Sequence, residues 1–544
     1  MTSASTIRKR TLAALGGVAI AAMVLSGCAA GNNPGTPGAS SGTLTVGTTD
    51  KVTTLDPAGS YDNGSFFIMN NVFPFLMNSN PGSSDVHPDI AESADFTAPT
   101  EYTVVLKKGL KFANGHDLTA SDVKFSFDRQ VKIAADNGPS TLLYNLDSTE
   151  VKDDLTVVFH LKAANDQIWP QILSSPAGPI VDEEVFSPDA VTTDKEIVDA
   201  NAFAGPYVIS SYKFNELVQF KAYKDYQGLL GTPKTATINL KYYADQSNMK
   251  LDVQEGNIDV ATRSLSATDV DSLSGNKNVT VHKGPGGEIR YIVFNFDTMP
   301  FGAKTADADA AKSLAVRQAI ADLIDREAIA NQVYKGTYLP LYSYVPAGLT
   351  GATEVLKDLY GNGSGGPDVD KAKSTLEAAG VTAPITLNLQ YNPDHYGASS
   401  GDEYALIKSQ LEASGLFTVN LQSTEWVQYS KDRSADVYPL YQLGWFPDYS
   451  DADNYLSPFF QKDNFLKNHF DDSAVTALIQ QQAVEADAAK RKSEIEDIQA
   501  KVAAELSTLP MLQGAQVVVS GKDVKGVDDT LDASFKFRFT VLSK

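Results

Sequence analysis

The sequence predicts an α/β protein with mixed sheets, folded as more than one domain. Helical and extended apolar patterns alternate between residues 316 and 421, and this alternation is typical of helices packed on a sheet. Without its N-terminal leader the chain has roughly 515 residues, which suffices for two or three domains with their own hydrophobic cores. Glycine and proline are scattered and no internal repeat is visible, which argues against a repeat architecture.

The N-terminus has the pattern of a secretory signal. Three basic residues, Arg8 to Arg10, precede an apolar run over residues 12–25 that is too short to cross a bilayer comfortably. The run ends in Leu-Ser-Gly-Cys, and its Cys28 is the only cysteine of the chain, so it cannot form an internal disulfide. This run resembles a bacterial lipobox, which implies cleavage after residue 27 and lipid on Cys28. The alternative is an ordinary signal peptide that contains a cysteine.

The charge of the chain excludes some partners. The net charge is −22, and loss of the three basic residues of the leader makes it −25. Such a surface repels nucleic acid and anionic lipid headgroups, so we expect no nucleic-acid partner. Residues 28–42 are rich in Gly, Asn, Pro, Ser and Ala, and this composition predicts a flexible tether between a membrane anchor and the folded body.

In the first half of the chain, Leu44 to Thr48 alternate as a strand. The stretch that begins at Tyr102 predicts a second strand, followed by a turn at Asn114-Gly115. Thr119 with Asp122 three positions later forms a capping box, which predicts a helix from Thr119 to about Arg129. A further strand or hairpin arm is expected over 151–161, and a short helix begins near Trp169.

In the second half, apolar positions from Val316 to Val333 fit one face of a single helix that stops at Gly336. Further helices are expected over 371–379, 404–412 and 475–506, and further strands over 385–389, 419–421, 437–443 and 517–519. We also predict a strand from Phe535 to Val541, which would return the chain to its first domain.

One stretch, residues 442–455, combines aromatic and acidic side chains with Gly444 and Pro447, which favour a bent backbone after the strand. A carboxylate beside aromatic rings at such a place suits a small ligand with a positive charge. An ammonium group could meet Asp448 while apolar groups lie against Trp445. The alternative is an acidic surface turn with Trp445 buried as core.

No pattern for catalysis or metal binding stands out. The six histidines are far apart and none has metal-ligand spacing, and Cys28 would be acylated. We therefore expect no metal, no cofactor and no enzymatic activity. A glycosidase pair among the many carboxylates stays open, so an exported carbohydrate hydrolase is the alternative from another class.

Seven segments, in order over about 350 residues, form a recognisable set: Gly109–Phe112 with Asn114–Val123, Gly205–Tyr207, Gln254–Asp259, Phe294–Phe296, Val316–Ile329, Asp370–Gly380 and Gly444–Tyr449. Together they resemble the peptide and nickel class of extracytoplasmic solute-binding proteins (family 5), the oligopeptide- and dipeptide-binding lipoproteins that serve ABC transporters. Ala204 departs from the Gly-Thr pair that is usual in the family before Gly-Pro-Tyr. The resemblance implies a two-lobed periplasmic-binding-protein-like fold of class II type, with a hinge between the lobes and an extra subdomain on the first.

The resemblance also implies boundaries. We expect the signal peptide over 1–27 and the tether over 28–42. The first lobe would comprise 43–85, 201–295 and 512–544, with the extra subdomain over 86–200, and the second lobe would comprise 296–511. The ligand would lie between the lobes, and the protein would deliver it to the permease subunits of an ABC transporter from the outer face of the cell membrane. We expect a monomer.

In peptide-binding members the aspartate of the Gly-Trp-x-x-Asp segment anchors the ligand's α-ammonium, which implies this role for Asp448. Trp445, Phe446 and Tyr449 would be its neighbours, as cavity wall or as the core behind it. A short peptide also needs a cation for its carboxylate. Arg433, otherwise a solvated surface residue, is one candidate. Arg290, at the expected start of the strand leading to Asn295, is another, and Asn295 itself is a further ligand-binding candidate.

A facing wall could come from the segment after the first strand, where Tyr61, Asn63, Phe66 and Phe67 follow in order. The same residues could equally be core. Other solutes that fit the class are an oligosaccharide, a nickel chelate and an opine.

Overall fold

The computed structural model describes residues 40–544, except 264, 394, 398, 463 and 535. The predicted signal peptide, Cys28 and most of the predicted tether therefore lie outside the described residues. Strand β1 (Ser40–Thr48) begins within the last part of that tether. None of the helices in the described residues has the length and apolar character needed to cross a membrane.

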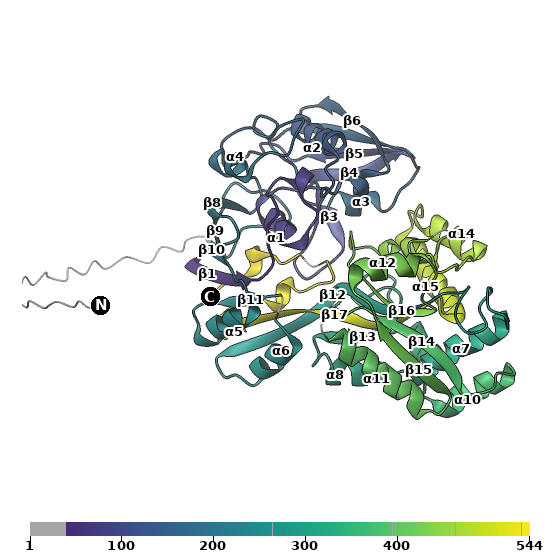
Figure 1. Ribbon diagram of the computed structural model, residues 1–544. Coiled ribbons are helices and arrows are strands. Elements are labelled where there is room, and N and C mark those ends of the chain that lie inside the picture. Colours follow the sequence, from purple (N-terminus) through teal and green to yellow (C-terminus); the bar gives the residue numbers. More distant parts are fainter. Residues whose placement is uncertain (1–39, 264, 394, 398, 463, 535) are drawn as a thin grey trace, which may run out of the picture. The chain divides into compact units, whose positions relative to one another are not determined.

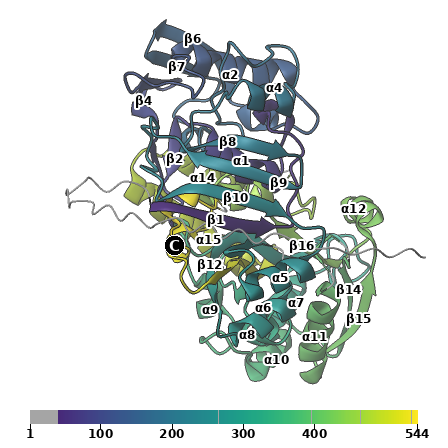
Figure 2. The same cartoon turned by 90° about the vertical axis from the view of Figure 1, so that its left-hand side faces the viewer.

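A mixed sheet dominates the fold. Within the described residues it has eleven strands, and β1 lies inside it, parallel to both of its neighbours. Figure 2 shows β1, β10, β9 and β8 side by side. In spatial order the strands are β15 (Phe417–Ser423), β14 (Ile385–Tyr391), β16 (Leu440–Trp445), β12 (Val279–Phe294), β17 (Thr508–Gly521), β11 (Val260–Thr262), β1, β10 (Thr235–Tyr242), β9 (Leu217–Ala222) and β8 (Tyr207–Lys213), with β13 (Tyr338–Pro340) on β17.

Two long strands lie next to each other in the interior of this sheet. β12 and β17 are antiparallel neighbours along most of their length, and both are labelled at the centre of Figure 1. Their pairing shifts register between Pro285 and Ile289. Within that interval a Cβ on Gly287 would lie 2.7 Å from Pro447 and 2.8 Å from the Tyr455 hydroxyl. Only glycine lets these segments approach the strand so closely.

A second, antiparallel sheet contains β4 (Ala91–Ala98), β5 (Glu101–Leu106), β7 (Thr156–Leu161) and β6 (Leu146–Asp153), in that order. Helix α2 (Ala120–Ile133) packs on it. The Thr119 and Asp122 side chains form the predicted capping box at the start of α2. The strand predicted over 151–161 is here the end of β6 and β7. A small hairpin pairs β2 (Met77–Ser79) with β3 (Val86–Pro88).

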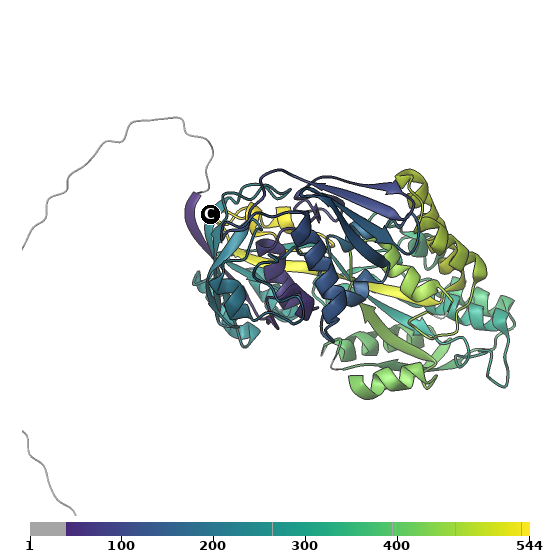
Figure 3. The ribbon, with the colours of Figure 1, turned by 90° about the horizontal axis from the view of Figure 1, so that it is seen from above.

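The remaining helices cover the sheets (Figure 1; Figure 3 from above). They are α1 (Asn63–Val72), α3 (Trp169–Ile172), α4 (Asp194–Asp199), α5 (Gln246–Glu255), α6 (Ala267–Ser274), α7 (Ala310–Leu323), α8 (Arg326–Gln332), α9 (Val355–Leu359), α10 (Val369–Ala378), α11 (Ser400–Ala413), α12 (Trp426–Ser434), α13 (Ser457–Phe460), α14 (Ser473–Gln482) and α15 (Ala488–Glu505). Short 3-10 turns are η1 (Pro57–Gly59), η2 (Ser140–Leu143), η3 (Ala452–Tyr455), η4 (Asp528–Thr530) and η5 (Phe539–Val541).

Buried apolar side chains form three large clusters. One surrounds β12, β14 and β16 with helices α7, α8 and α11. A second surrounds β1, β8, β9 and β10 with α1 and includes Ile197. A third joins β5 and β7 to α2 and α3. Ile197 lies within the extra subdomain predicted over 86–200 but packs with the β1 cluster. The division into lobes stays a prediction.

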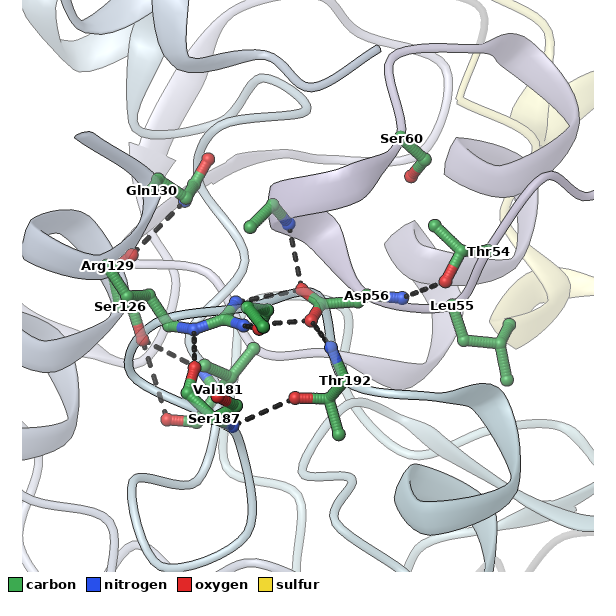
Figure 4. A network of polar contacts seen from close by, with 12 residues as sticks. Thr54, Leu55, Asp56, Ser60, Ser126, Arg129, Gln130, Val181, Ser187 and Thr192 are labelled. Atoms are coloured by element: carbon green, nitrogen blue, oxygen red, sulfur yellow. Dashed lines mark hydrogen bonds and ion pairs between the residues drawn. The ribbon is translucent and has the colours of Figure 1, made fainter. Parts of the chain in front are cut away.

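A buried ion pair links η1 to helix α2 (Figure 4). The Arg129 guanidinium donates two hydrogen bonds of 2.8 Å to the two carboxylate oxygens of Asp56. It also donates to the carbonyls of Ser187 and Ala190, while Asp56 accepts from the Thr192 backbone N–H. Both charged side chains are almost completely excluded from water. The pair therefore fastens the segment after β1 to α2 and to the loop at 187–192.

Three sequence predictions about elements are wrong. The single helix predicted from Val316 is two helices, α7 and α8, because Asp325 leaves the helical conformation and caps the second with a bond to the Ala328 N–H. The strand predicted from 437 begins only at Leu440. The strand predicted from Phe535 to Val541 is absent in residues 536–541, which instead end in η5. Phe537 and Phe539 pack against Phe67 without pairing as a strand.

Candidate functional site

A cavity of about 290 Å³ lies beside the loop that follows β16. Its lining comes from segments far apart in the sequence. These are the start of α1 and the residues before it, α3 with the residues that follow it, the position after β11, the loop itself and the C-terminal segment. The lining residues are Tyr61, Asp62, Asn63, Phe66, Phe67, Gln171, Ser174, Ser175, Pro176, Arg263, Phe446, Pro447, Asp448, Tyr449, Ser450, Ser534 and Lys536.

The sheet positions the loop. β16 pairs on one side with β14 and on the other with β12, where Trp445 lies opposite Ile289. The next position back is Gly444, where a Cβ would lie 2.9 Å from the Tyr396 ring and 3.1 Å from the Ile289 carbonyl oxygen. A glycine at this position therefore allows β16 to pass close to Tyr396. Beyond Trp445 the chain leaves the sheet and enters the cavity wall.

Asn454 holds the loop in shape. Its buried side-chain oxygen accepts hydrogen bonds of 2.9 Å from the Trp445 indole N–H and from the Asp448 backbone N–H. Its amide nitrogen lies 3.4 Å from a carboxylate oxygen of Asp448. One buried side chain thus connects the end of β16 to Asp448.

The other two aspartates of the loop have structural partners. Asp451 receives two hydrogen bonds, of 2.7 and 2.8 Å, from Arg491 on α15. Asp453 is buried and accepts hydrogen bonds from Ser457, Gln482 and Tyr449. Burial raises the pKa of the Asp453 carboxyl to about 6, although the Ser457 hydrogen bond opposes this rise.

Asp448 differs from these two because its half-buried carboxylate lines the cavity. One of its oxygens accepts a hydrogen bond from the hydroxyl of Tyr61. Desolvation and the Asp448 charge together raise the pKa of this tyrosine, so the hydroxyl stays protonated and donates. The salt bridges found among the described residues do not include Asp448, and the partners found there for its carboxylate are the Tyr61 hydroxyl and the Asn454 amide.

The three aromatic residues predicted beside Asp448 have different positions relative to the cavity. Phe446 is 48% exposed and lines the cavity. Tyr449 also lines it, packs against the α2 cluster and donates its hydroxyl hydrogen to Asp453. Trp445 stands edge-on to Phe459 and Phe465, with ring centroids 5.1 and 5.5 Å away. It is not among the lining residues, and lies behind the wall.

Neither predicted arginine lines this cavity. Arg433 is only 6% exposed, so its description as a solvated surface residue is wrong: its guanidinium lies over the ring of Phe465, 4.7 Å from the centroid. Arg290 lies in the interior of β12, not at the start of a strand. Its side chain is buried with the Glu288 carboxylate at 3.1 Å and the Tyr338 hydroxyl at 2.8 Å.

A smaller cavity of about 190 Å³ adjoins the first, because Arg263 and Phe446 line both. Its wall includes the residues of β17 from Gly514 to Val518, together with Glu288 and Tyr338. Arg290 is therefore one layer behind this second cavity, held there by its two partners.

Asn295 lies elsewhere, at the end of β12. Its amide nitrogen donates a hydrogen bond of 2.9 Å to Asp436. Asp436, Asp297 and His469 bring possible metal-ligand atoms within 4.8 Å of one another, a grouping that sequence spacing did not reveal. The Lys304 ammonium is 2.7 Å from Asp297 and 3.9 Å from Asp436, so a cation already balances this group.

The sequence left two roles open for the segment after the first strand, cavity wall or core, and both occur in the structure. Tyr61, Asn63, Phe66 and Phe67 all line the cavity, although Phe67 is also buried in the β1 cluster. Lys536 was missed. The signal for it in the sequence was a lysine between two phenylalanines near the C-terminus, and that segment was interpreted as a strand returning to the first domain.

Three comparisons with known proteins agree with one another. A family model for bacterial extracellular solute-binding proteins, family 5 middle, matches residues 85–467. The dipeptide-binding protein DppE of Bacillus subtilis is 23% identical over 538 residues, covering 92% of this chain and 94% of its own. The dipeptide-binding protein of Escherichia coli is 23% identical over 423 residues, 74% of each chain.

The fold itself is shared with solved structures. The crystal structure of the ABC transporter substrate-binding protein CtaP from Listeria monocytogenes matches with a TM-score of 0.75 and 22% identity. The match covers 92% of this chain and 99% of that one. This likeness confirms the predicted α/β fold of the two-lobed binding-protein type.

Proposed function

Because this chain belongs to the bacterial extracellular solute-binding proteins of family 5, as its sequence motifs predict, we propose that it captures short peptides and delivers them to an ABC importer. The ligand would occupy the cavity beside the β16 loop. The family consists of solute-binding proteins, and the proposed role requires no catalytic step.

The observation that carries this proposal is the carboxylate of Asp448 in the cavity wall. Asp451 and Asp453 have structural partners, whereas Asp448 has hydrogen-bond donors but no ion pair with any residue that the structure describes. A partly desolvated carboxylate of this kind favours a ligand that brings its own positive charge. The free amino end of a peptide supplies such a charge together with N–H donors.

Tyr61 supports the same role from the opposite wall. Its hydroxyl already donates to Asp448 and can remain on one carboxylate oxygen while an ammonium meets the other. Phe446, exposed between the two cavities, offers an apolar surface for a ligand side chain. A ligand that contacts both Tyr61 and the Asp448 loop would hold these segments together, which is how ligand binding favours one arrangement of two lobes.

The remaining parts of the proposal concern location and partners. We propose that the signal peptide over 1–27 is removed, that lipid on Cys28 attaches the protein to the outer face of the cell membrane, and that 28–42 serves as the tether. The folded body would act as a monomer with the permease subunits. The expected lobe boundaries belong to this proposal as well.

The test is the substitution Asp448→Asn, with Asp307→Asn as the control because Asp307 is exposed. A hydrogen bond to a charged group contributes about 1.5–3 kcal/mol, so peptide affinity should fall more than tenfold in Asp448→Asn and stay unchanged in the control. Native mass spectrometry first identifies a co-purified or added peptide, and calorimetry then measures its affinity. Equal affinities for wild type and Asp448→Asn would remove Asp448 from the site.

Other outcomes separate the alternatives. A co-purified mass that matches an oligosaccharide, a nickel chelate or an opine would replace the peptide assignment within the same class of protein. Turnover of an oligosaccharide by the purified protein would instead support the exported hydrolase.

A further inference from the structure

A buried lysine lines the same cavity as Asp448. Lys536 is 6% exposed, and its ammonium donates a hydrogen bond to the hydroxyl of Ser174, which also lines the cavity. The ion pairs found among the described residues do not include Lys536. A hydroxyl does not neutralise the positive charge of a buried ammonium. Burial of such a charge is costly unless an opposite charge accompanies it.

The surroundings of Lys536 make this imbalance larger. Arg538, two residues further on, is also buried and donates to neutral groups of Asn70, Asn78 and Ser79. Burial, and after it the Arg538 charge, lowers the pKa of Lys536 well below its ordinary value, while Asp532 and Asp89 oppose this shift. An anion that entered the cavity would lie where two buried cations favour it.

We infer that Lys536, with Ser174, binds the carboxylate of the same ligand whose ammonium is held by Asp448. This inference rests on the proposed function and narrows it. The cavity then recognises a short zwitterion, with both ends of the ligand inside one enclosure. Its volume of about 290 Å³ is just below the range of ligand pockets, which span about 300–1,000 Å³. A peptide of two or three residues therefore fits this site better than a long one.

Other cations are less suited to this role. Arg290 and Arg433, the two arginines that the sequence suggested, do not line the cavity. Arg263 does line it, but its Nε is 2.7 Å from the Asp50 carboxylate, so an anion already accompanies its charge. Within the part of the chain that the structure describes, the direct polar contact found for the Lys536 ammonium is the Ser174 hydroxyl.

The first experiment changes the ligand and leaves the protein intact. A panel of dipeptides and tripeptides is screened by calorimetry, and the tightest binder is compared with its C-terminal amide and its N-acetyl form. Wild-type protein should bind the amide at least tenfold more weakly than the free acid, because the amide removes the negative charge. Equal binding of acid and amide would overturn the role of Lys536.

The second experiment assigns this discrimination to a side chain. In Lys536→Met the acid should lose affinity at least tenfold and the ratio between acid and amide should approach one. Lys536→Arg should keep a part of the ratio, and the exposed control Lys522→Met should keep all of it. Discrimination that survives Lys536→Met but disappears in Arg263→Met would assign the carboxylate to Arg263 and overturn the inference.

The two proposals fail in different ways. If peptides bind, and N-acetylation weakens them while amidation does not, the capture of peptides at Asp448 stands and Lys536 has no part in it. If no member of the panel binds, the proposed function is wrong and the inference is wrong with it. Circular dichroism of each variant shows whether the substitution has left the fold intact, and the comparison of ligands in wild type needs no variant.

Discussion

Replacement of Arg129 by methionine should destabilise the protein strongly without touching the candidate site. The guanidinium makes two hydrogen bonds of 2.8 Å to Asp56, one of 2.9 Å to the Ser187 carbonyl and one of 3.1 Å to the Ala190 carbonyl. Methionine fills much of the same space but leaves Asp56 with two backbone donors, from Ala58 and Thr192.

The magnitude follows from the burial of this pair. Removal of one partner from a buried ion pair costs about 3–5 kcal/mol, because the other charge stays in a water-excluded place. The apolar methionine side chain recovers about 1 kcal/mol of this through its own burial. We therefore expect a net loss of about 3 kcal/mol in the free energy of unfolding. Adding Asp56→Asn to Arg129→Met removes the stranded charge, so the double variant should be more stable than the single one.

The assay is urea unfolding followed by circular dichroism, with Lys132→Met on the same helix as the matched control. Lys132 pairs with Asp189 at the surface, where both side chains are 65% exposed, and such pairs contribute little. A stability loss in Arg129→Met that equals the loss in Lys132→Met would refute the argument, because the buried pair would then be worth no more than an exposed one.

Three further predictions concern the loop after β16. Asn454→Ala removes the oxygen that accepts hydrogen bonds from the Trp445 indole and from the Asp448 N–H. The free energy of unfolding should therefore fall by about 1–3 kcal/mol, and calorimetry should show weaker peptide binding. Unchanged values would mean that the loop holds its shape without Asn454. Gly444→Ala places a Cβ 2.9 Å from the Tyr396 ring and should cost about 1–3 kcal/mol in thermal unfolding; a neutral effect would show that the ring moves freely. The pKa of Asp453 is raised from 3.8 to about 6 in the native state, so its stabilising contribution is present below pH 3.8 and is lost as the pH rises through 6. The free energy of unfolding of wild type, measured relative to Asp453→Asn, should fall by about 1–3 kcal/mol between pH 4 and pH 7, and a constant difference would contradict this.

The elements that depend on local pattern were predictable. The capping box at Thr119 depends on residues a few positions apart and is present, and the strand predicted over 437–443 is present as β16, although it begins and ends later than predicted. The break between α7 and α8 was missed because the apolar face continues across it, while the capping side chain of Asp325 ends the regular helix.

The role of a charged residue was predictable only where its neighbours in the sequence indicate its surroundings. Asp448 could be proposed because it follows a buried strand beside aromatic residues. The surroundings of Arg433 and Lys536 could not, because their partners, Phe465 and Ser174, are 32 and 362 residues away. A lysine between two phenylalanines resembles an exposed position of a strand until the contact across the chain is known.

The close approach at Gly287 couples parts of the molecule that the cavity also joins. Its backbone carbonyl accepts a hydrogen bond of 2.7 Å from Tyr455, and a Cβ there would meet both Pro447 and the Ala533 carbonyl oxygen at 2.7 Å. The loop with Asp448 and the segment with Lys536 therefore both abut the stretch where β12 and β17 lose their regular pairing. We therefore expect a bend of the strands at this stretch to change the separation of the two charged side chains, and with it the width of the cavity.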